Sequence, residues 1–190
     1  TDGSTIAHSA AKMGHVRVLR WIVEFDLIDP VLLARTATDR WNIAHTAACY
    51  GKPDVLQWII DAGQCALLTS PAGNGWGIGD IAASQGQTET LRWIADSPRL
   101  GPAFLRSTGG DDRSVAHIAA RHNQVDVLQW ILDASQLGAL LLRHVASDGF
   151  TIAHTAAKFN RVDVLRWINS TPSLGVALLK ATSTDGSTIA

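Results

Sequence analysis

One pattern of apolar and polar positions recurs five times along the chain. Each copy has an alanine-rich stretch, a turn, a stretch resembling Val-Leu-x-Trp-Ile, and a connection that ends in large apolar residues. The tryptophans of the second stretch are separated by 37, 35, 37 and 37 residues: Trp21, Trp58, Trp93, Trp130 and Trp167. A fixed period in this range indicates a solenoid of stacked repeats. We predict a single domain, residues 1–190, with repeats at about 1–37, 38–72, 73–109, 110–146 and 147–183 and a partial sixth at 184–190.

Each repeat is predicted to hold two helices. A side chain with an oxygen that can cap a helix precedes the first apolar pattern in four repeats: Thr5, Asn42, Ser114 and Thr151. Before the second pattern, Pro53 and Asp54 are residue types favoured in a first helical turn. The recurring tryptophan lies on the apolar face of the second helix, and we interpret all five as core residues.

Several short motifs resemble a known family. Thr5-Ile6-Ala7-His8 and its copies resemble the Thr-Pro-Leu-His motif of ankyrin repeats, and Ala10-Ala11 matches the residues that follow it. Met13-Gly14-His15-Val16-Arg17-Val18-Leu19 is similar to the Asn-Gly-His-Leu-Glu-Val-Val of that family. The resemblance runs through the whole chain in five copies. It implies an all-α, ankyrin-like helical solenoid of stacked helix-turn-helix repeats.

The chain departs from that family in two respects. Ile or Val replaces the proline that starts the first helix, and the period is about four residues longer than the usual 33 or so. The additional residues lie in connections such as 97–105 and 171–179. In these extended connections we expect an apolar turn or a short third helix instead of the finger-like hairpin of the family.

Composition narrows the choice of partners and compartment. Lys and Arg number 16 against 17 Asp and Glu, so the chain lacks the basic excess of a nucleic-acid binder. No apolar run approaches the roughly 20 residues of a membrane span, and we expect no membrane insertion. Two cysteines, Cys49 and Cys65, cannot form a disulfide framework, and no signal peptide is visible. We therefore expect a cytoplasmic protein, or one in a host cytosol if it is a secreted effector.

Three patterns suggest chemistry. Histidine recurs at one position of four repeats: His8, His45, His117 and His154. These side chains could be metal ligands or bases, or they could form hydrogen bonds to the backbone that connect adjacent repeats. We favour the second, which is also the role that the ankyrin resemblance implies. His45 and Cys49 are four residues apart, as a base and a nucleophile could be, but no orienting acid lies beside them. The glycine-rich stretch 73–79 lacks the preceding strand and following lysine of a phosphate loop. We expect no catalytic residue, no metal site and no cofactor.

The ankyrin resemblance implies a binding surface made of the inter-repeat tips and the exposed side of each first helix. Aromatic and basic residues, which are enriched at binding hot spots, gather at the corresponding positions. The candidate partner-binding residues are Arg40, Trp41, Tyr50, Trp76, Arg113, Arg121, His122, Phe150, Lys158 and Phe159. An alternative is that the aromatic residues at the tips only cover the long connections of the neighbouring repeat.

We therefore expect a non-enzymatic module that presents a concave aromatic and basic surface to a partner protein or peptide. The alternative is a targeting segment of a larger enzyme, such as a secreted bacterial effector, whose catalytic domain lies outside this chain. Residues 1–7 and 184–190 have the same sequence, Thr-Asp-Gly-Ser-Thr-Ile-Ala, so both ends look like internal repeats. This predicts a longer parent chain or end-to-end self-association. The third repeat, with Gly75, Gly77, Gly79 and Asp80, is expected to be the least stable.

Overall fold

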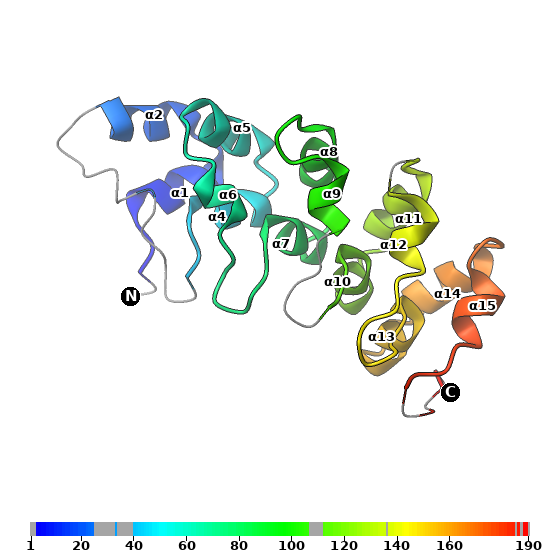
Figure 1. Ribbon diagram of the computed structural model, residues 1–190. Coiled ribbons are helices and arrows are strands. Elements are labelled where there is room, and N and C mark those ends of the chain that lie inside the picture. The colour runs from blue at the N-terminus through cyan, green and yellow to red at the C-terminus, as the bar shows by residue number, and fades with distance from the viewer. Residues whose placement is uncertain are drawn as a thin grey trace. The chain divides into compact units, whose positions relative to one another are not determined.

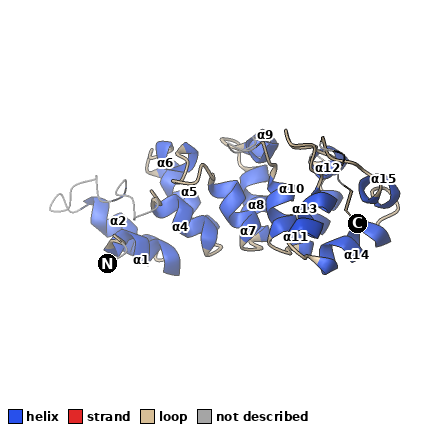
Figure 2. Ribbon diagram, turned by 90° about the horizontal axis from the view of Figure 1, so that it is seen from below, coloured by secondary structure: helices blue, strands red, loops and turns tan. Residues whose placement is uncertain are grey.

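The structure is a computed structural model that describes residues 3–24, 33, 40–106, 112–135, 137–184, 186 and 188–189. Within these ranges every element of regular secondary structure is a helix, and no strand occurs (Figures 1 and 2). The helices follow one another in the order short helix, turn, longer helix, as the apolar pattern predicts. The expected all-α repeat fold is confirmed.

The alanine-rich stretch of each repeat forms its first helix. These helices are α1 (Ile6–Met13), α4 (Ile43–Cys49), α7 (Ile78–Ser84), α10 (Val115–Arg121) and α13 (Ile152–Lys158). Their alanines are buried apart from the half-buried Ala157, and their small side chains let neighbouring helices approach closely. Two of the four predicted caps form: the side chain of Asn42 accepts hydrogen bonds from the backbone N–H groups of Ala44 and His45, and that of Thr151 accepts one from the N–H of His154. The hydroxyls of the other two, Thr5 and Ser114, lie instead beside Nδ1 of the recurring histidine three residues later.

The stretch that contains the recurring tryptophan forms the second helix. These helices are α2 (Val16–Glu24), α5 (Pro53–Asp61), α8 (Thr88–Asp96), α11 (Val125–Asp133) and α14 (Val162–Ser170). One residue with positive φ turns the chain between the first and second helix of every repeat, and it is a glycine or an asparagine. At this position Gly14, Gly51, Gly86, Asn123 and Asn160 have φ of 75°, 63°, 71°, 60° and 56°. These two residue types occupy the left-handed region most readily, which explains why they recur here.

Short third helices occupy the extended connections. They are α6 (Ala66–Thr69), α9 (Gly101–Arg106), α12 (Gly138–Leu142) and α15 (Gly175–Leu179). Their leucines close the core, since Leu68, Leu105 and Leu142 are fully buried. The expectation of a short third helix in place of a hairpin is confirmed for these four connections.

The chain divides into two compact units, Thr1–Ala82 and Ala83–Ala190. In the first unit α1 packs on α4, and α2 and α6 complete the layer around α4 and α5. In the second unit α10 packs on α13 in the same way, and α11 lies against α8, α12 and α14. The boundary between the units falls within α7, in the repeat that the sequence analysis expects to be the least stable.

The interpretation of all five recurring tryptophans as core residues is wrong in part. Trp58 and Trp167 are buried, with 6% and 9% of their surface exposed, whereas Trp93 and Trp130 are half-buried and Trp21 is 48% exposed. A contact with the preceding repeat accounts for the burial of Trp167. In the second unit the indole N–H of Trp167 donates to Oε1 of Gln129 on α11 at 2.8 Å, so the ring lies against the second helix of the preceding repeat.

Candidate functional site

The recurring histidine forms hydrogen bonds between the first helix of its repeat and nearby backbone groups. The ring Nδ1 of His45 accepts a hydrogen bond from the backbone N–H of Asn42, the residue that caps α4, at 3.0 Å. The Nε2 of the same ring lies 2.9 Å from the carbonyl oxygen of Ser70. Because a carbonyl can only accept and Nδ1 is already an acceptor, Nε2 carries the proton, and the ring is the neutral tautomer.

An equivalent hydrogen bond from the histidine Nε2 connects consecutive repeats. Nε2 of His8 lies 2.9 Å from the carbonyl oxygen of Trp41, and Nε2 of His117 lies 3.0 Å from that of Phe150. In both cases the carbonyl belongs to the tip that precedes the first helix of the next repeat. The interpretation that the recurring histidines bond the backbone and join adjacent repeats is confirmed for His8 and His117.

His45 bonds the carbonyl of Ser70 within its own repeat, and in the described residues His154 bonds only the cap of its own helix, Thr151. In the third repeat Asp80 takes the histidine position, and its Oδ2 accepts the backbone N–H of Gly77 at 3.1 Å.

Burial keeps two of these rings neutral. The pKa of His117 falls from 6.5 to about 4, first because burial disfavours the charged ring; the Phe150 carbonyl opposes this shift, and His144 and Arg113 add to it. Burial also lowers the pKa of His45 and raises that of Cys49. Both ring nitrogens of His45 are engaged by backbone groups, so the ring is not placed to activate the Cys49 thiol. The geometry assigns His45 a structural role.

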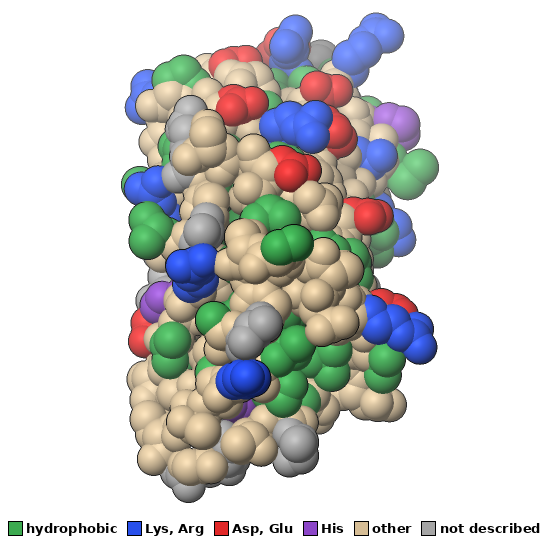
Figure 3. Space-filling view, turned by 90° about the vertical axis from the view of Figure 1, so that its right-hand side faces the viewer, with side chains coloured by type: hydrophobic (Ala, Val, Ile, Leu, Met, Phe, Trp, Pro, Cys, Tyr) green, Lys and Arg blue, Asp and Glu red, His purple; other side chains and the backbone are tan. Residues whose placement is uncertain are grey.

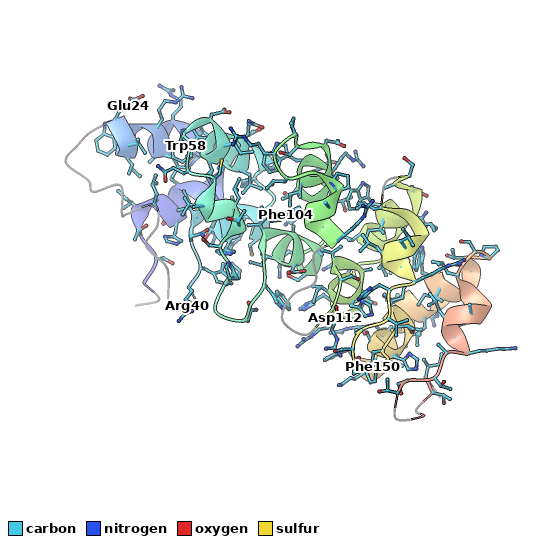
Figure 4. The ribbon with its side chains drawn as sticks, in the orientation of Figure 1. Glu24, Arg40, Trp58, Phe104, Asp112 and Phe150 are labelled. Atoms are coloured by element: carbon cyan, nitrogen blue, oxygen red, sulfur yellow. The ribbon has the colours of Figure 1, made fainter. Side chains whose placement is uncertain are left out.

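In the second unit, three cations lie over aromatic rings of the predicted binding positions. The Lys158 ammonium is 5.2 Å from the centre of the Phe150 ring, and the Arg113 guanidinium is 5.9 Å from the same ring. The Arg121 guanidinium is 4.6 Å from the centre of the Phe159 ring. We call Arg113, Arg121, Phe150, Lys158 and Phe159 the aromatic–basic surface. Figure 4 shows Phe150 at the start of α13.

Each of these side chains is held by its surroundings. Arg113 also forms an ion pair with Asp148, with Nη2 and Oδ2 2.5 Å apart. The Phe150 ring stacks on the ring of His154, 5.4 Å away between centres. Two of the contacts, Arg113 with Phe150 and Arg121 with Phe159, join one repeat to the next along the chain. The surface therefore forms only when α10 and α13 are packed together.

His122 lies beside this surface and differs from the buried histidines. It follows α10 directly and is half-buried. Burial lowers its pKa, and the nearby charges of Arg121 and Arg161 lower it further. Arg161 itself donates from Nε to the backbone carbonyl oxygen of Arg121 at 2.7 Å, which places its guanidinium at the C-terminal end of α10. The local field is positive, so a negative group is favoured here.

The first unit holds the four remaining candidates. Arg40 is exposed, and Trp41 is half-buried with its ring centre 6.3 Å from that of His45 (Figure 4 labels Arg40). Tyr50 is exposed at the end of α4, and the Lys12 ammonium lies 4.7 Å from the centre of its ring. Trp76 is half-buried in the turn before α7, where its backbone N–H donates to Oδ1 of Asn74.

The predicted residues thus form groups within each unit: Arg40 and Trp41 at one tip, and the aromatic–basic surface with His122 in the second unit. Three residues outside the predicted set also contribute. Lys12 pairs with Tyr50, Asp148 pairs with Arg113, and His154 supports Phe150. Lys12 could have been found, because it occupies the same position of its helix as Lys158 does.

Over the ranges that the structure describes, no group of three or more His, Cys, Asp or Glu side chains could hold a metal ion. None of the helices in the described part of the chain has the length and apolar character needed to cross a membrane.

Helix pairs joined by a left-handed residue, with a histidine that connects one repeat to the next, define a helical repeat protein. The family model for ankyrin repeats, in three copies, matches residues 79–172, and the chain belongs to the ankyrin repeat family through this stretch. Ankyrin repeats are generally protein–protein interaction modules and are typically non-catalytic. A comparison with curated proteins gives no match.

Proposed function

We propose that this protein is an interaction module that binds a partner protein or peptide through its aromatic–basic surface. The observation that carries the proposal is the set of cation–ring contacts of Phe150 and Phe159, which arise at positions chosen from the sequence for binding. Aromatic residues and arginine are the types most enriched at binding hot spots. In the space-filling view of Figure 3, Lys and Arg side chains stand beside hydrophobic ones on the face that it draws.

The energetic advantage of this surface is its preorganisation. Long cationic side chains lose rotamer entropy when a partner fixes them, and each loss costs roughly 0.5–1.5 kcal/mol of binding free energy. Here the rings of Phe150 and Phe159 already hold the charged groups of Arg113, Arg121 and Lys158. A partner that contacts both ring and cation would therefore bind at a smaller entropic cost.

A peptide-display selection on the intact chain tests this function. We expect wild-type protein to enrich related peptides, and Phe159→Ala to weaken their binding at least fivefold, since hot-spot truncations typically cost more than about 1 kcal/mol. The control is Val162→Ala, which truncates an exposed apolar residue at the start of α14. Absence of any enriched peptide, or equal binding by wild type and Phe159→Ala, would contradict the proposal.

A further inference from the structure

A groove between the second helices of the first two repeats has the features of a binding site. It lies in the first unit, where α2 packs against α5 (Figure 1), and its volume is about 950 Å³. We propose that this groove binds a partner peptide through a carboxylate, which accepts a hydrogen bond from the indole N–H of Trp58 and is attracted by Arg20. The aromatic–basic surface belongs to the other unit, so this site does not depend on the function proposed above.

The indole N–H of Trp58 is a donor without an acceptor in this groove. The side chain is only 6% exposed, and it forms part of the groove wall (Figure 4 labels Trp58). Among the residues that the structure describes, no group accepts a hydrogen bond from this N–H. The nitrogen is not enclosed by protein atoms either, so a ligand in the groove can reach it. Since buried polar side chains nearly always have a partner, the ligand is expected to supply the acceptor.

The second unit shows what an acceptor at this position does. There Trp167 is the equivalent of Trp58, and its N–H donates to Oε1 of Gln129 on the preceding second helix at 2.8 Å. The residue equivalent to Gln129 in the first repeat is Arg20, because each directly precedes the recurring tryptophan of its repeat. Arginine carries five N–H donors and no acceptor, so Arg20 cannot receive the bond that Gln129 receives.

Another pair of repeats in the second unit agrees with this comparison. In the third repeat Arg92 occupies the position of Arg20, and the tryptophan of the next repeat is Trp130. These two side chains line a smaller hollow of about 160 Å³ beside α8 and α11. Within the described ranges the indole N–H of Trp130 also has no acceptor. The indole bond therefore forms with glutamine at this position and is missing with arginine.

The charges of the groove favour a carboxylate on the side of α2. Arg17 and Arg20 are exposed, three residues apart on α2, and in the described part of the chain no ion pair joins either of them to α5. The acids of the opposite wall have other roles. Asp54 lies in the first turn of α5, where the helix dipole favours a negative charge, and Asp61 accepts a hydrogen bond from Gln57 at 2.9 Å. The groups left for a ligand are donors and cations, which bind an anionic acceptor.

The shape of the groove favours a peptide as the source of this carboxylate. The wall formed by α5 runs from Asp54 to Asp61, about 10 Å at 1.5 Å per residue, and the groove is open to solvent along it. Val18 and Trp21, which are 41% and 48% exposed, add apolar surface for a large side chain next to the carboxylate. Asp54 and Asp61 repel an extended polyanion such as a nucleic acid. We therefore expect a single carboxylate flanked by apolar residues.

Nuclear magnetic resonance of the ¹⁵N-labelled intact chain observes each indole N–H directly, and Trp58→Phe assigns the resonance of Trp58. The probes are N-acetyl-Leu-Glu-Leu-amide and its uncharged isostere N-acetyl-Leu-Gln-Leu-amide. We expect the glutamate peptide to shift the Trp58 indole resonance saturably and to bind at least fivefold tighter than the glutamine peptide, because a charged acceptor forms the stronger hydrogen bond. Equal binding, or an unchanged Trp58 resonance, would overturn the inference. Sodium acetate that binds as tightly as the glutamate peptide would overturn the choice of a peptide.

Exchange of one residue should convert one repeat pair into the other. Arg20→Gln introduces the acceptor that Gln129 provides in the second unit, so the Trp58 N–H should exchange more slowly without peptide. The glutamate peptide should then bind tenfold or more weakly. Gln129→Arg should do the reverse and make the Trp167 indole respond to the peptide. No loss of binding in the first variant, or no response of Trp167 in the second, would contradict the assignment.

Two control variants separate this site from net charge and from the aromatic–basic surface. Arg166→Gln makes the same charge change at the equivalent position of the fifth repeat, where the exposed arginine pairs only with Asp163 three residues earlier. This variant and Phe159→Ala should both bind the glutamate peptide like wild type. Equal loss in Arg166→Gln and Arg20→Gln would mean that net charge alone attracts the peptide. Loss of the Trp58 response in Phe159→Ala would mean that the peptide binds at the other surface, and either result would overturn the inference.

Discussion

Replacement of His117 by glutamine should remove a defined part of the pH dependence of folding. The ring of His117 is fully buried, donates from Nε2 to the carbonyl oxygen of Phe150, and lies 3.0 Å through Nδ1 from the hydroxyl of Ser114. Its pKa of about 4 in the folded chain is below the ordinary value of 6.5, chiefly because of burial. As the pH falls, the unfolded chain therefore binds this proton first. The stabilisation is fully present above pH 6.5 and is lost as the pH falls towards 4.

The size of the effect follows from the two pKa values. A difference of one unit is worth about 1.4 kcal/mol, so complete protonation would remove about 3 kcal/mol, and about 2 kcal/mol is already lost at pH 5. The burial that lowers the pKa of His45 acts in the same direction, so wild type alone cannot isolate His117. The difference between wild type and His117→Gln does, because all other groups are shared.

Chemical denaturation of both proteins between pH 7.5 and pH 5 measures this difference. Glutamine keeps an N–H donor near the Phe150 carbonyl but does not titrate. We expect His117→Gln to be the less stable protein at pH 7.5 and the gap in unfolding free energy to shrink by about 2 kcal/mol at pH 5. A gap that stays constant with pH, or that widens in acid, would refute the reasoning. The positions of His144, Arg113 and Asp148 near the ring would then need a different electrostatic account.

Three further predictions concern stability. Trp58→Ala should cost about 3–5 kcal/mol of unfolding free energy, since the ring is buried, whereas Trp21→Ala should cost about 1 kcal/mol; equal losses in denaturation would contradict the burial seen here. Gly149→Ala should cost more than about 2 kcal/mol of unfolding free energy, because φ is 82° and a Cβ would meet the backbone nitrogen of Thr184. Gly63→Ala, with φ of 73° and open space around the Cβ, should cost about 1 kcal/mol. Similar melting temperatures for the two variants would show that the contact with Thr184 is unimportant. Hydrogen exchange of amides 75–86 should be faster than that of amides 112–123, because Gly75, Gly77 and Gly79 loosen the third repeat; slower exchange there would argue against a weak third repeat.

Local signals in the sequence predicted much of the fold, because each depends on neighbouring residues only. Asn42 and Thr151 cap their helices as their side chains indicate, and the apolar connections form short helices such as α9. Neighbours from other repeats are harder to foresee. Periodicity places Trp21 on an apolar face, but whether that face is covered depends on what packs against it, and 48% of the side chain is exposed.

The sequence predicted which residues form the candidate site but not which side chains pair with one another. Repeat register identified Phe150, Phe159, Arg121 and Lys158, since equivalent positions are neighbours in consecutive repeats. It did not show that Asp148 would pair with Arg113, because register identifies which positions are neighbours but not where their side chains end. The bond from His45 to Ser70, and not to the carbonyl of Trp76, has a similar origin. The interval from Trp58 to Trp93 is two residues shorter than the other intervals between these tryptophans, so repeat register alone does not identify the carbonyl beside this ring.

The central claim is that this ankyrin repeat protein binds its partner at the ends of α10 and α13. Nuclear magnetic resonance of ¹⁵N-labelled protein, titrated with the tightest peptide from the display selection, tests it most directly. The account predicts that the largest amide shifts fall at Arg113, at 121–123 and at 158–160, with little change along α11 and α14. Shifts confined to the second helices α11 and α14, with the amides at the ends of α10 and α13 unchanged, would contradict the account.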